Sequence, residues 1–285
     1  MLTLGSTGDD VKKLQEFLGI TADGIFGNGT LQAVKNWQAQ HGLTSDGIAG
    51  PKTLSAMGLL DTNQIDSPLY FEKRYMDKDE YYAGPTQKQW VFLHHTAGWH
   101  NPLNVVSSWN NDTRGLIATE FVLGGQSITN NDNSYDGMAV QAFPEGGYAW
   151  HLGIGNNAMH RNSVGIELCN FSWVKNGKTY VNSPVAASQI VNLSKPFRGF
   201  SSYHRYSDKQ LETLKKLLLF IADRDSIDIT KGLPERIKQI GADAFDECNI
   251  EMCCKKPGLW SHSNVDRGKF DVFPQPELID MLLSM

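Results

Sequence analysis

The sequence has no long apolar run and no concentrated basic segment. Its longest apolar run, residues 217–222, is far shorter than the roughly 18 residues that a membrane-spanning helix needs. The formal net charge is −5, and there is no glycine-rich phosphate loop. Phosphate backbones are bound by concentrated positive charge, so this balance disfavours nucleic acid as a partner. We expect neither membrane insertion nor nucleic-acid binding.

The first residues also lack the basic start and apolar core of a secretory signal, and they run directly into helix-like sequence. This predicts a chain that is made in the cytoplasm without a signal peptide. If it acts outside the cell, something else must release it.

Cysteine is scarce as well, with four residues at Cys169, Cys248, Cys253 and Cys254. In a chain of this length without a signal, four cysteines do not indicate a disulfide framework. The spacing of the last three is not the paired C-x-x-C of structural zinc sites. Free or buried thiols are favoured, and a metal or redox role is the alternative.

The remaining composition is that of a folded protein, with 40% hydrophobic and 20% charged residues in 285. The length allows one large domain and one small one. An internal repeat marks the small one, because residues 23–33 recur as residues 46–56 at a constant offset of 23. Each copy has an Asp-Gly turn, a second glycine and a helix start, and Pro51 suits a first helical turn.

Apolar residues at helical spacing surround this repeat. A first helix is predicted from Val11, Leu14, Phe17 and Leu18, and a second from Leu31, Val34 and Trp37. Thr7 and Asp10 have the spacing of a capping box before the first helix. The pattern predicts an all-α module of three helices over residues 1–60.

This segment resembles the peptidoglycan-binding type 1 domain, a small helical cell-wall module. The resemblance includes both Asp-Gly-x-x-Gly copies and the stretch from 34 to 43. It implies bacterial peptidoglycan as the partner of the module. It does not assign the residues that contact the wall.

The rest of the chain has a different pattern. Periodicity fades over residues 61–87, which indicates a linker or an arm packed on the next domain. Strand-like runs follow at 90–93, 121–123 and 163–168. A helix with an apolar face is predicted after Ser207, with Gln210 at the capping position. Residues 88–285 are therefore predicted to form an α/β domain in which helices flank a mixed central sheet.

Three elements of this domain carry reactive side chains. His94 and His95 end an apolar strand, and only one of them can share a face with Phe92. His262 is followed by Lys269 and Asp271, which project to the same side in an extended chain. Glu167 faces away from its aliphatic neighbours in a strand, where a carboxylate needs a partner or a cleft. Taken singly, each has an ordinary alternative: a structural histidine, a polar surface loop or a solvated glutamate.

Together these elements resemble the type 2 N-acetylmuramoyl-L-alanine amidases, a family that includes amidase-type phage lysozymes and peptidoglycan recognition proteins. The resemblance runs from about residue 89 to 283. The motifs that carry it occur in the family's order, at residues 92–97, 148–153, 162–167, 206–210 and 262–271.

The resemblance implies that His94, His262 and Asp271 bind one zinc ion. Three protein ligands leave a fourth position for water, as in catalytic zinc sites, and zinc lowers the pKa of that water to about 7. Glu167 and Lys269 match the family's catalytic acidic and basic residues. Residues that would orient a ligand or contact substrate are His151, His95 and Asn162, with His95 a neighbour of the ligands and not one of them.

The sequence departs from the family pattern in two places. Thr119 and Glu120 stand where the family usually has an aromatic residue and a histidine. Residues 228–259, which hold the three clustered cysteines, are longer than the usual approach to the second histidine. We interpret this stretch as an insertion of unknown role.

The resemblance as a whole implies a peptidoglycan hydrolase that cleaves the amide bond between N-acetylmuramic acid and L-alanine. A monomer is expected, although the sequence does not decide the oligomeric state. A phage endolysin released through a host membrane pore fits a wall-binding module without a signal peptide, and a secreted bacterial effector would look similar. Two other functions stay open: a zinc peptidase that cuts within the stem peptide, and a non-catalytic peptidoglycan recognition protein.

Overall fold

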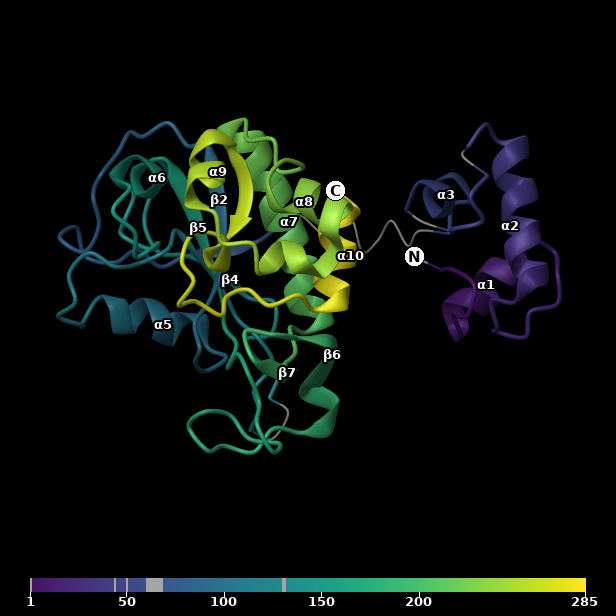
Figure 1. Ribbon diagram of the computed structural model, residues 1–285, viewed down its shortest axis with the longest axis horizontal. Coiled ribbons are helices and arrows are strands. Elements are labelled where there is room, and N and C mark those ends of the chain that lie inside the picture. Colours follow the sequence, from purple (N-terminus) through teal and green to yellow (C-terminus); the bar gives the residue numbers. More distant parts are fainter. Residues whose placement is uncertain (1, 44, 50, 60–68, 130–131) are drawn as a thin grey trace. The chain divides into compact units, whose positions relative to one another are not determined.

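The computed structural model describes residues 2–43, 45–49, 51–59, 69–129 and 132–285. The chain divides into two compact units, Met1–Pro68 and Leu69–Met285 (Figure 1). Of the expected linker, residues 61–68 lie outside the described residues. Residues 69–87 include strand β1 (Phe71–Lys73), which joins the sheet of the second unit.

In the described part of the first unit there are three helices, as predicted: α1 (Asp9–Phe17), α2 (Asn28–Gln40) and α3 (Pro51–Ala56). Its core includes the predicted apolar positions Val11, Leu14 and Val34. Phe17 differs from the prediction, because its side chain is 43% exposed and lies edge-on against Trp37.

The capping box predicted at Thr7 and Asp10 is wrong. Helix α1 begins at Asp9, one residue later than that motif requires, and its N-cap is Gly8. Glycine has no side chain, so no side-chain hydrogen bond caps this helix.

A buried glutamine explains the 23-residue repeat. The Nε2 of Gln15 donates to Asp23 Oδ1 at 2.8 Å, to Ile25 O at 2.9 Å and to Thr30 Oγ1 at 3.0 Å. Its Oε1 accepts from Gly24 N at 2.8 Å. The same four contacts recur around Gln38, with distances of 2.9, 2.9, 3.0 and 2.9 Å. Each glutamine thus ties one Asp-Gly turn to the helix that follows it.

The second unit is built on a mixed six-stranded sheet of order β1-β4-β3-β5-β2-β8. Strands β3, β5, β2 and β8 run parallel, and β4 is antiparallel to β3. The bounds are β2 (Trp90–His95), β3 (Phe121–Leu123), β4 (Ala139–Gln141), β5 (Ser163–Leu168) and β8 (Gly258–Ser261). A separate hairpin pairs β6 (Ile190–Phe197) with β7 (Phe200–His204).

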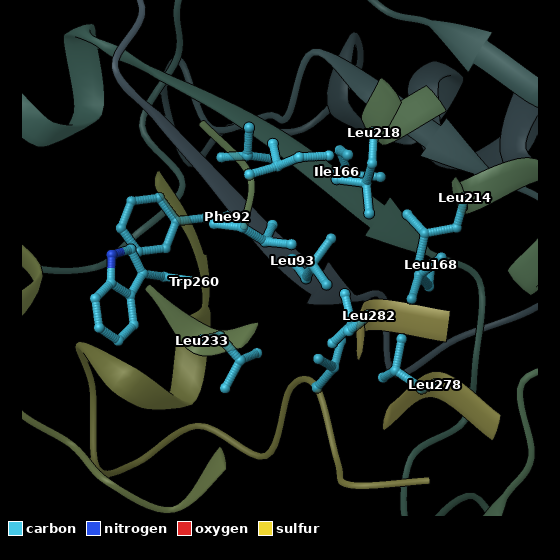
Figure 2. Packing of buried hydrophobic residues seen from close by; sticks show 14 of the residues in the cluster. Phe92, Leu93, Ile166, Leu168, Leu214, Leu218, Leu233, Trp260, Leu278 and Leu282 are labelled. Carbon is cyan, nitrogen blue, oxygen red and sulfur yellow. The ribbon is translucent and has the colours of Figure 1, made fainter. Parts of the chain in front are cut away.

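Helices cover both faces of this sheet. On one face, Leu93, Ile166 and Leu168 point toward leucines of α7 (Asp208–Asp225) and α10 (Pro276–Leu283), and α8 (Leu233–Ile240) packs beside them (Figure 2). On the other face, Val122 packs against α5 (Pro102–Trp109). The remaining short helices and turns are α6 (Asn157–Arg161), α9 (Ile250–Lys255), η1 (Ala187–Gln189), η2 (Gly241–Phe245) and η3 (His262–Asn264).

The predicted start of α7 is confirmed, because Ser207 Oγ accepts from Gln210 N at 2.9 Å. The helix spans 18 residues, with leucines at the spacing of one face buried against the sheet. Within the part of the chain that the structure describes, no helix combines the length and apolarity needed to cross a membrane.

Candidate metal centre and catalytic pocket

The candidate site lies at the carboxyl ends of three adjacent parallel strands. His94 of β2 is in register with Glu167 of β5, and Leu93 is in register with Ser261, the last residue of β8. His262 follows β8 directly. The carboxyl ends of parallel strands form the usual ligand-binding edge of an α/β sheet. Parallel pairing therefore brings together residues that lie as far apart in sequence as 94 and 262.

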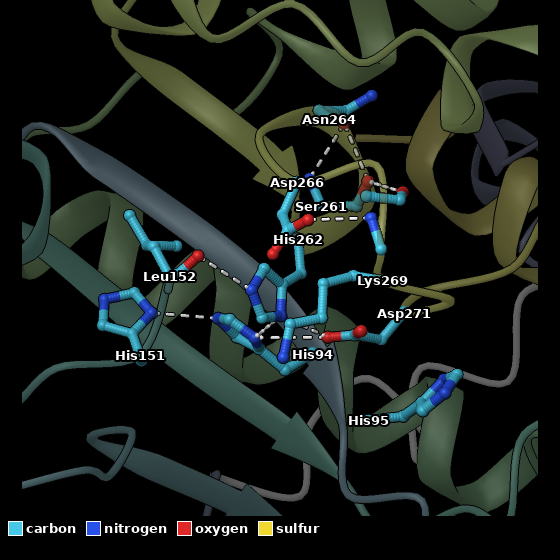
Figure 3. A network of polar contacts seen from close by, with 12 residues as sticks. His94, His95, His151, Leu152, Ser261, His262, Asn264, Asp266, Lys269 and Asp271 are labelled. Atoms are coloured by element: carbon cyan, nitrogen blue, oxygen red, sulfur yellow. Dashed lines mark hydrogen bonds and ion pairs between the residues drawn. The ribbon is translucent and has the colours of Figure 1, made fainter. Parts of the chain in front are cut away.

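Three side chains converge at this edge. His94 Nδ1 lies 2.9 Å from His262 Nδ1 and 3.3 Å from Asp271 Oδ2, and His262 Nδ1 lies 2.8 Å from Asp271 Oδ2 (Figure 3). All three residues are buried, and each offers a ligand atom within 4.8 Å of the others. This group could hold a metal ion.

The hydrogen bonds of the outer ring atoms show why a cation fits. His262 Nε2 lies 3.0 Å from the carbonyl oxygen of Leu152, which only accepts, so the ring hydrogen sits on Nε2. The Nδ1 lone pair of His262 therefore faces the carboxylate of Asp271. A divalent cation between them satisfies both acceptors, and the set of two imidazole nitrogens and one carboxylate oxygen is typical of zinc.

Electrostatics favour the metal-binding forms of His94 and Asp271. Burial, reinforced by neighbouring His262, lowers the pKa of His94 to about 4, so its ring is neutral near pH 7. Burial alone would raise the pKa of Asp271. The neighbouring rings of His262 and His94 outweigh this effect and bring that pKa well below its usual range. Neutral imidazoles and an ionised carboxylate are the forms that bind metal.

His151 stands behind the first ligand. Its Nδ1 lies 2.9 Å from His94 Nε2, and its own Nε2 lies 2.7 Å from Ser163 Oγ. Space for the ring comes from Gly165, where an added Cβ would lie 3.1 Å from His151 Nδ1. Such a chain of contacts fixes the orientation of a ligand histidine. His151 is therefore placed to hold His94, and it does not belong to the converging group.

Glu167 and Lys269 border the same cluster. The Oε2 of Glu167 is buried and has no hydrogen-bond partner among the described residues. Burial raises the pKa of Glu167 well above its usual range, Asp271 adds to this effect, and Lys269 opposes it. Val164 and Ile166 pack into the core on the opposite face, as the strand alternation predicts.

The other two candidate residues lie elsewhere. His95 faces the side of the sheet that α7 and α10 cover, where its Nδ1 lies 2.9 Å from Tyr206 Oη. Figure 3 shows it apart from the cluster. It still lines the outer part of the pocket. Asn162 ends α6 and accepts backbone hydrogen bonds from Gln89 and Trp90 through its carbonyl. It is not among the residues that line the pocket.

A cavity of about 830 Å³ opens over the cluster. Its lining includes residues of α5, residues 114 and 117–119, and residues 172, 173, 180 and 268–270. Large aromatic side chains that sequence reasoning missed line it, namely Trp99, Trp109, Trp173, Tyr180 and Phe270. Their positions in loops and on α5 follow no periodicity that would have identified them.

The departures from the family pattern have structural explanations. Thr119 lines the pocket, whereas Glu120 turns into the interior and accepts from Arg224 Nη1 at 2.6 Å and from Gln141 Nε2 at 2.9 Å. Glu120 is therefore a buried ion-pair partner.

All four cysteines are free, and within the described ranges the residues that could hold a metal as a group of three are His94, His262 and Asp271.

Comparisons with known proteins match each of the two units to a described family. The model of the family described as N-acetylmuramoyl-L-alanine amidase matches residues 84–246, more than half of the chain. A model described as a putative peptidoglycan binding domain matches residues 7–57. His262, Lys269 and Asp271 lie beyond the first match, so their placement rests on the structure. No curated protein matches the chain.

Several solved structures are similar to parts of it. The endolysin of Burkholderia phage AP3 is 48% identical over 20% of this chain and 24% of its own, with a TM-score of 0.20. PlyL is 13% identical over 71% of this chain and 86% of its own, with a TM-score of 0.41. The Escherichia coli amidase AmiD is 22% identical over 52% of this chain and 47% of its own, with a TM-score of 0.32. The chain thus spans about a quarter of the AP3 endolysin and about half of AmiD.

Proposed function

Because the chain belongs to the N-acetylmuramoyl-L-alanine amidase family, we propose that it is a zinc-dependent hydrolase of bacterial peptidoglycan. The bond that it cleaves is the amide between N-acetylmuramic acid and the L-alanine of the stem peptide. The proposal rests above all on one observation: three buried atoms lie close together at the floor of a large cavity, namely His94 Nδ1, His262 Nδ1 and Asp271 Oδ2.

These three residues would hold a zinc ion, which would supply a Lewis acid and lower the pKa of water. The neighbouring side chains handle protons and charge. Glu167 accepts the proton of the attacking water and passes it to the amide nitrogen as the C–N bond breaks. Its raised pKa suits this role, because a carboxyl group that holds its proton well can deliver it to a leaving amine.

Lys269 contributes positive charge beside the reacting carbonyl. Its ammonium group interacts electrostatically with both Glu167 and His94, which places its charge at the cluster. A fixed positive charge at this point stabilises the oxygen that becomes negative when the carbonyl is attacked. His151 keeps the ring of His94 in the orientation that presents Nδ1 to the metal.

The N-terminal unit holds the enzyme on its substrate. Its match to a putative peptidoglycan binding domain supports the wall as partner. A second attachment point raises the local concentration of the catalytic unit at the wall without any change at the active site. As to origin, we propose a phage lysis enzyme that is made in the host cytoplasm and reaches the wall after release.

Metal content and activity together test this proposal. The purified protein is expected to hold one zinc ion per chain, and chelation should abolish hydrolysis until zinc is added back. His262→Ala should lose zinc and activity together, because two remaining ligands bind zinc poorly. His204→Asn is the matched control, since His204 is also buried in this unit but lies outside the cluster. Full activity in metal-free protein would refute the mechanism.

A further inference from the structure

The loop of residues 262–271 carries most of the candidate chemistry. It begins with His262 and ends with Asp271, and Lys269 lies between them. A backbone hydrogen bond from Ser263 N to Asp271 O, at 2.8 Å, closes the loop at its base. The part before Lys269 includes the exposed Gly268, and glycine allows many backbone conformations. Within the loop, Lys269 N donates to Asp266 O at 3.2 Å and Gly268 N donates to Asp266 Oδ1 at 2.7 Å, and a contact from outside the loop adds to these.

Arg198 makes that contact. It lies at the tip of the β6–β7 hairpin, where it and Gly199 have φ values of 50° and 86°. Two consecutive residues with positive φ form the tight turn that suits a twisted hairpin. A positive φ is uncommon for a residue with a side chain and is often retained at functional positions. Here it aims the guanidinium at the loop.

The guanidinium binds three carbonyl oxygens of the loop. Nη1 donates to Lys269 O at 2.9 Å and to Arg267 O, and Nη2 donates to Ser263 O at 3.1 Å. The carbonyls of Arg267 and Lys269 flank the flexible Gly268. Arg198 therefore fixes the backbone on both sides of this glycine and, with it, the starting point of the Lys269 side chain.

The Nε side of the Arg198 guanidinium contacts residues 228–259, the stretch interpreted above as an insertion. Arg198 Nε donates to Asp246 Oδ1 at 2.5 Å, and the arginine side chain is only 10% exposed. The same stretch also binds the base of the loop, because Ser263 Oγ donates to Phe245 O at 2.7 Å and Asn264 Nδ2 donates to Ala244 O at 2.8 Å. The hairpin and residues 244–247 thus enclose the loop from two sides.

We propose that Arg198, supported by Asp246, is a positioning residue that holds Lys269 at the reaction centre, and that the insertion serves this clamp. The proposal rests on the proposed function for its kinetic consequence but not for its structural one. A planar guanidinium spreads its N–H groups over three nitrogens and here reaches Asp246 and three carbonyls at once, whereas a lysine carries its three N–H groups on a single nitrogen. Arg198→Lys should therefore restore little of what Arg198→Ala loses.

A double-mutant cycle with Lys269 tests the kinetic consequence on a soluble N-acetylmuramoyl-peptide. Arg198→Ala is expected to lower kcat by about 10- to 100-fold with little change in KM, since small misplacements of a catalytic group have effects of this size. In the Lys269→Ala background the same change should cost less than about threefold, because the group it positions is gone. Equal losses in both backgrounds would overturn the proposal.

Two further measurements separate positioning from a general structural role. Zinc content should be the same in Arg198→Ala and in the wild type, and a loss of zinc in step with activity would show that Arg198 acts on the ligands instead. Lys195→Ala is the matched control, because Lys195 bridges the same hairpin to Asp243 at 2.6 Å through exposed side chains. It should leave kcat and zinc unchanged, and a loss equal to that of Arg198→Ala would overturn the specific clamp.

Hydrogen exchange tests the clamp without any activity. In the full-length protein, the amides of residues 263–271 should exchange faster in Arg198→Ala than in the wild type and in Lys195→Ala. Unchanged exchange would overturn the proposal. If the wild type hydrolyses no muramoyl-peptide, the proposed function fails, and the exchange result alone decides whether Arg198 holds the loop.

Discussion

Glu167→Gln separates proton transfer from metal binding and from folding. Glutamine has nearly the shape of glutamate but cannot take up or release the proton. The structure indicates that the change leaves the fold intact, because Glu167 Oε2 has no hydrogen-bond partner among the described residues. General acid–base catalysis contributes about 10²- to 10⁴-fold, so kcat should fall by that factor, which is roughly 3–5 kcal/mol of activation free energy.

Although Glu167→Gln should lower kcat, it should not lower the stability of the folded protein. Burial raises the pKa of Glu167, so the folded zinc-free protein disfavours the ionised form that the unfolded chain adopts above its ordinary pKa. This penalty is absent below the unfolded pKa and grows as the pH rises above it. Zinc-free Glu167→Gln should therefore be at least as stable as the wild type at pH 7, and thermal unfolding measures the difference.

Glu120→Gln is the matched control. Glu120 is also a buried glutamate, directly before the neighbouring strand β3, but its carboxylate pairs with Arg224 and does not line the cavity. Breaking a buried ion pair costs about 3 kcal/mol, so Glu120→Gln should be destabilised and keep its kcat. The assay is hydrolysis of a soluble N-acetylmuramoyl-peptide by zinc-loaded protein. A Glu167→Gln variant with wild-type turnover refutes the acid–base role, and one without zinc makes Glu167 part of the metal site.

Three further outcomes are expected. Residues 69–285 alone should hydrolyse soluble muramoyl-peptides like the whole chain but sediment with purified walls at least about tenfold more weakly, and equal sedimentation would contradict the role of the first unit. Burial lowers the pKa of His204 to about 4, so between pH 7 and pH 5 the unfolded chain binds a proton at this residue that the folded protein excludes. The wild type therefore loses stability as the pH falls, and His204→Asn should remove about 2 kcal/mol of this loss, measured by urea unfolding. An unchanged pH dependence of the unfolding free energy would contradict this expectation. Gln38→Ala removes four hydrogen bonds and should destabilise the first unit by about 3 kcal/mol, seen as faster amide exchange in α2, whereas the exposed Gln32→Ala should not.

Local patterns predicted the parts of the site that local geometry determines. Alternation along residues 163–168 was enough to place Glu167 opposite Ile166, because side chains in a strand change face at every residue. The capping residue Ser207 was predictable for the same reason, since its partner Gln210 is three residues away. The prediction from the motif at Thr7 was wrong because the N-cap of the helix is Gly8, one residue after Thr7.

Contacts between distant segments left no such pattern. Arg198 binds Lys269 across 71 residues, and Glu120 pairs with Arg224 across 104. An arginine at a hairpin tip and a glutamate before a strand are both ordinary surface residues by sequence alone. Their burial depends on how the hairpin and α7 pack on the sheet, which only the folded structure shows.

The products of wall digestion test the central claim most directly, because they identify the bond. Hydrolysis of the lactyl amide should release stem peptides that begin with a free L-alanine amine, together with glycan strands stripped of peptide. No new reducing sugar ends should form, since glycosidic cleavage proceeds through two carboxylates that flank the sugar bond. Mass spectrometry of the products and derivatisation of N-terminal alanine provide the measurement. Peptides that shorten internally while still joined to muramic acid would identify a peptidase, and new reducing ends would contradict the catalytic mechanism altogether.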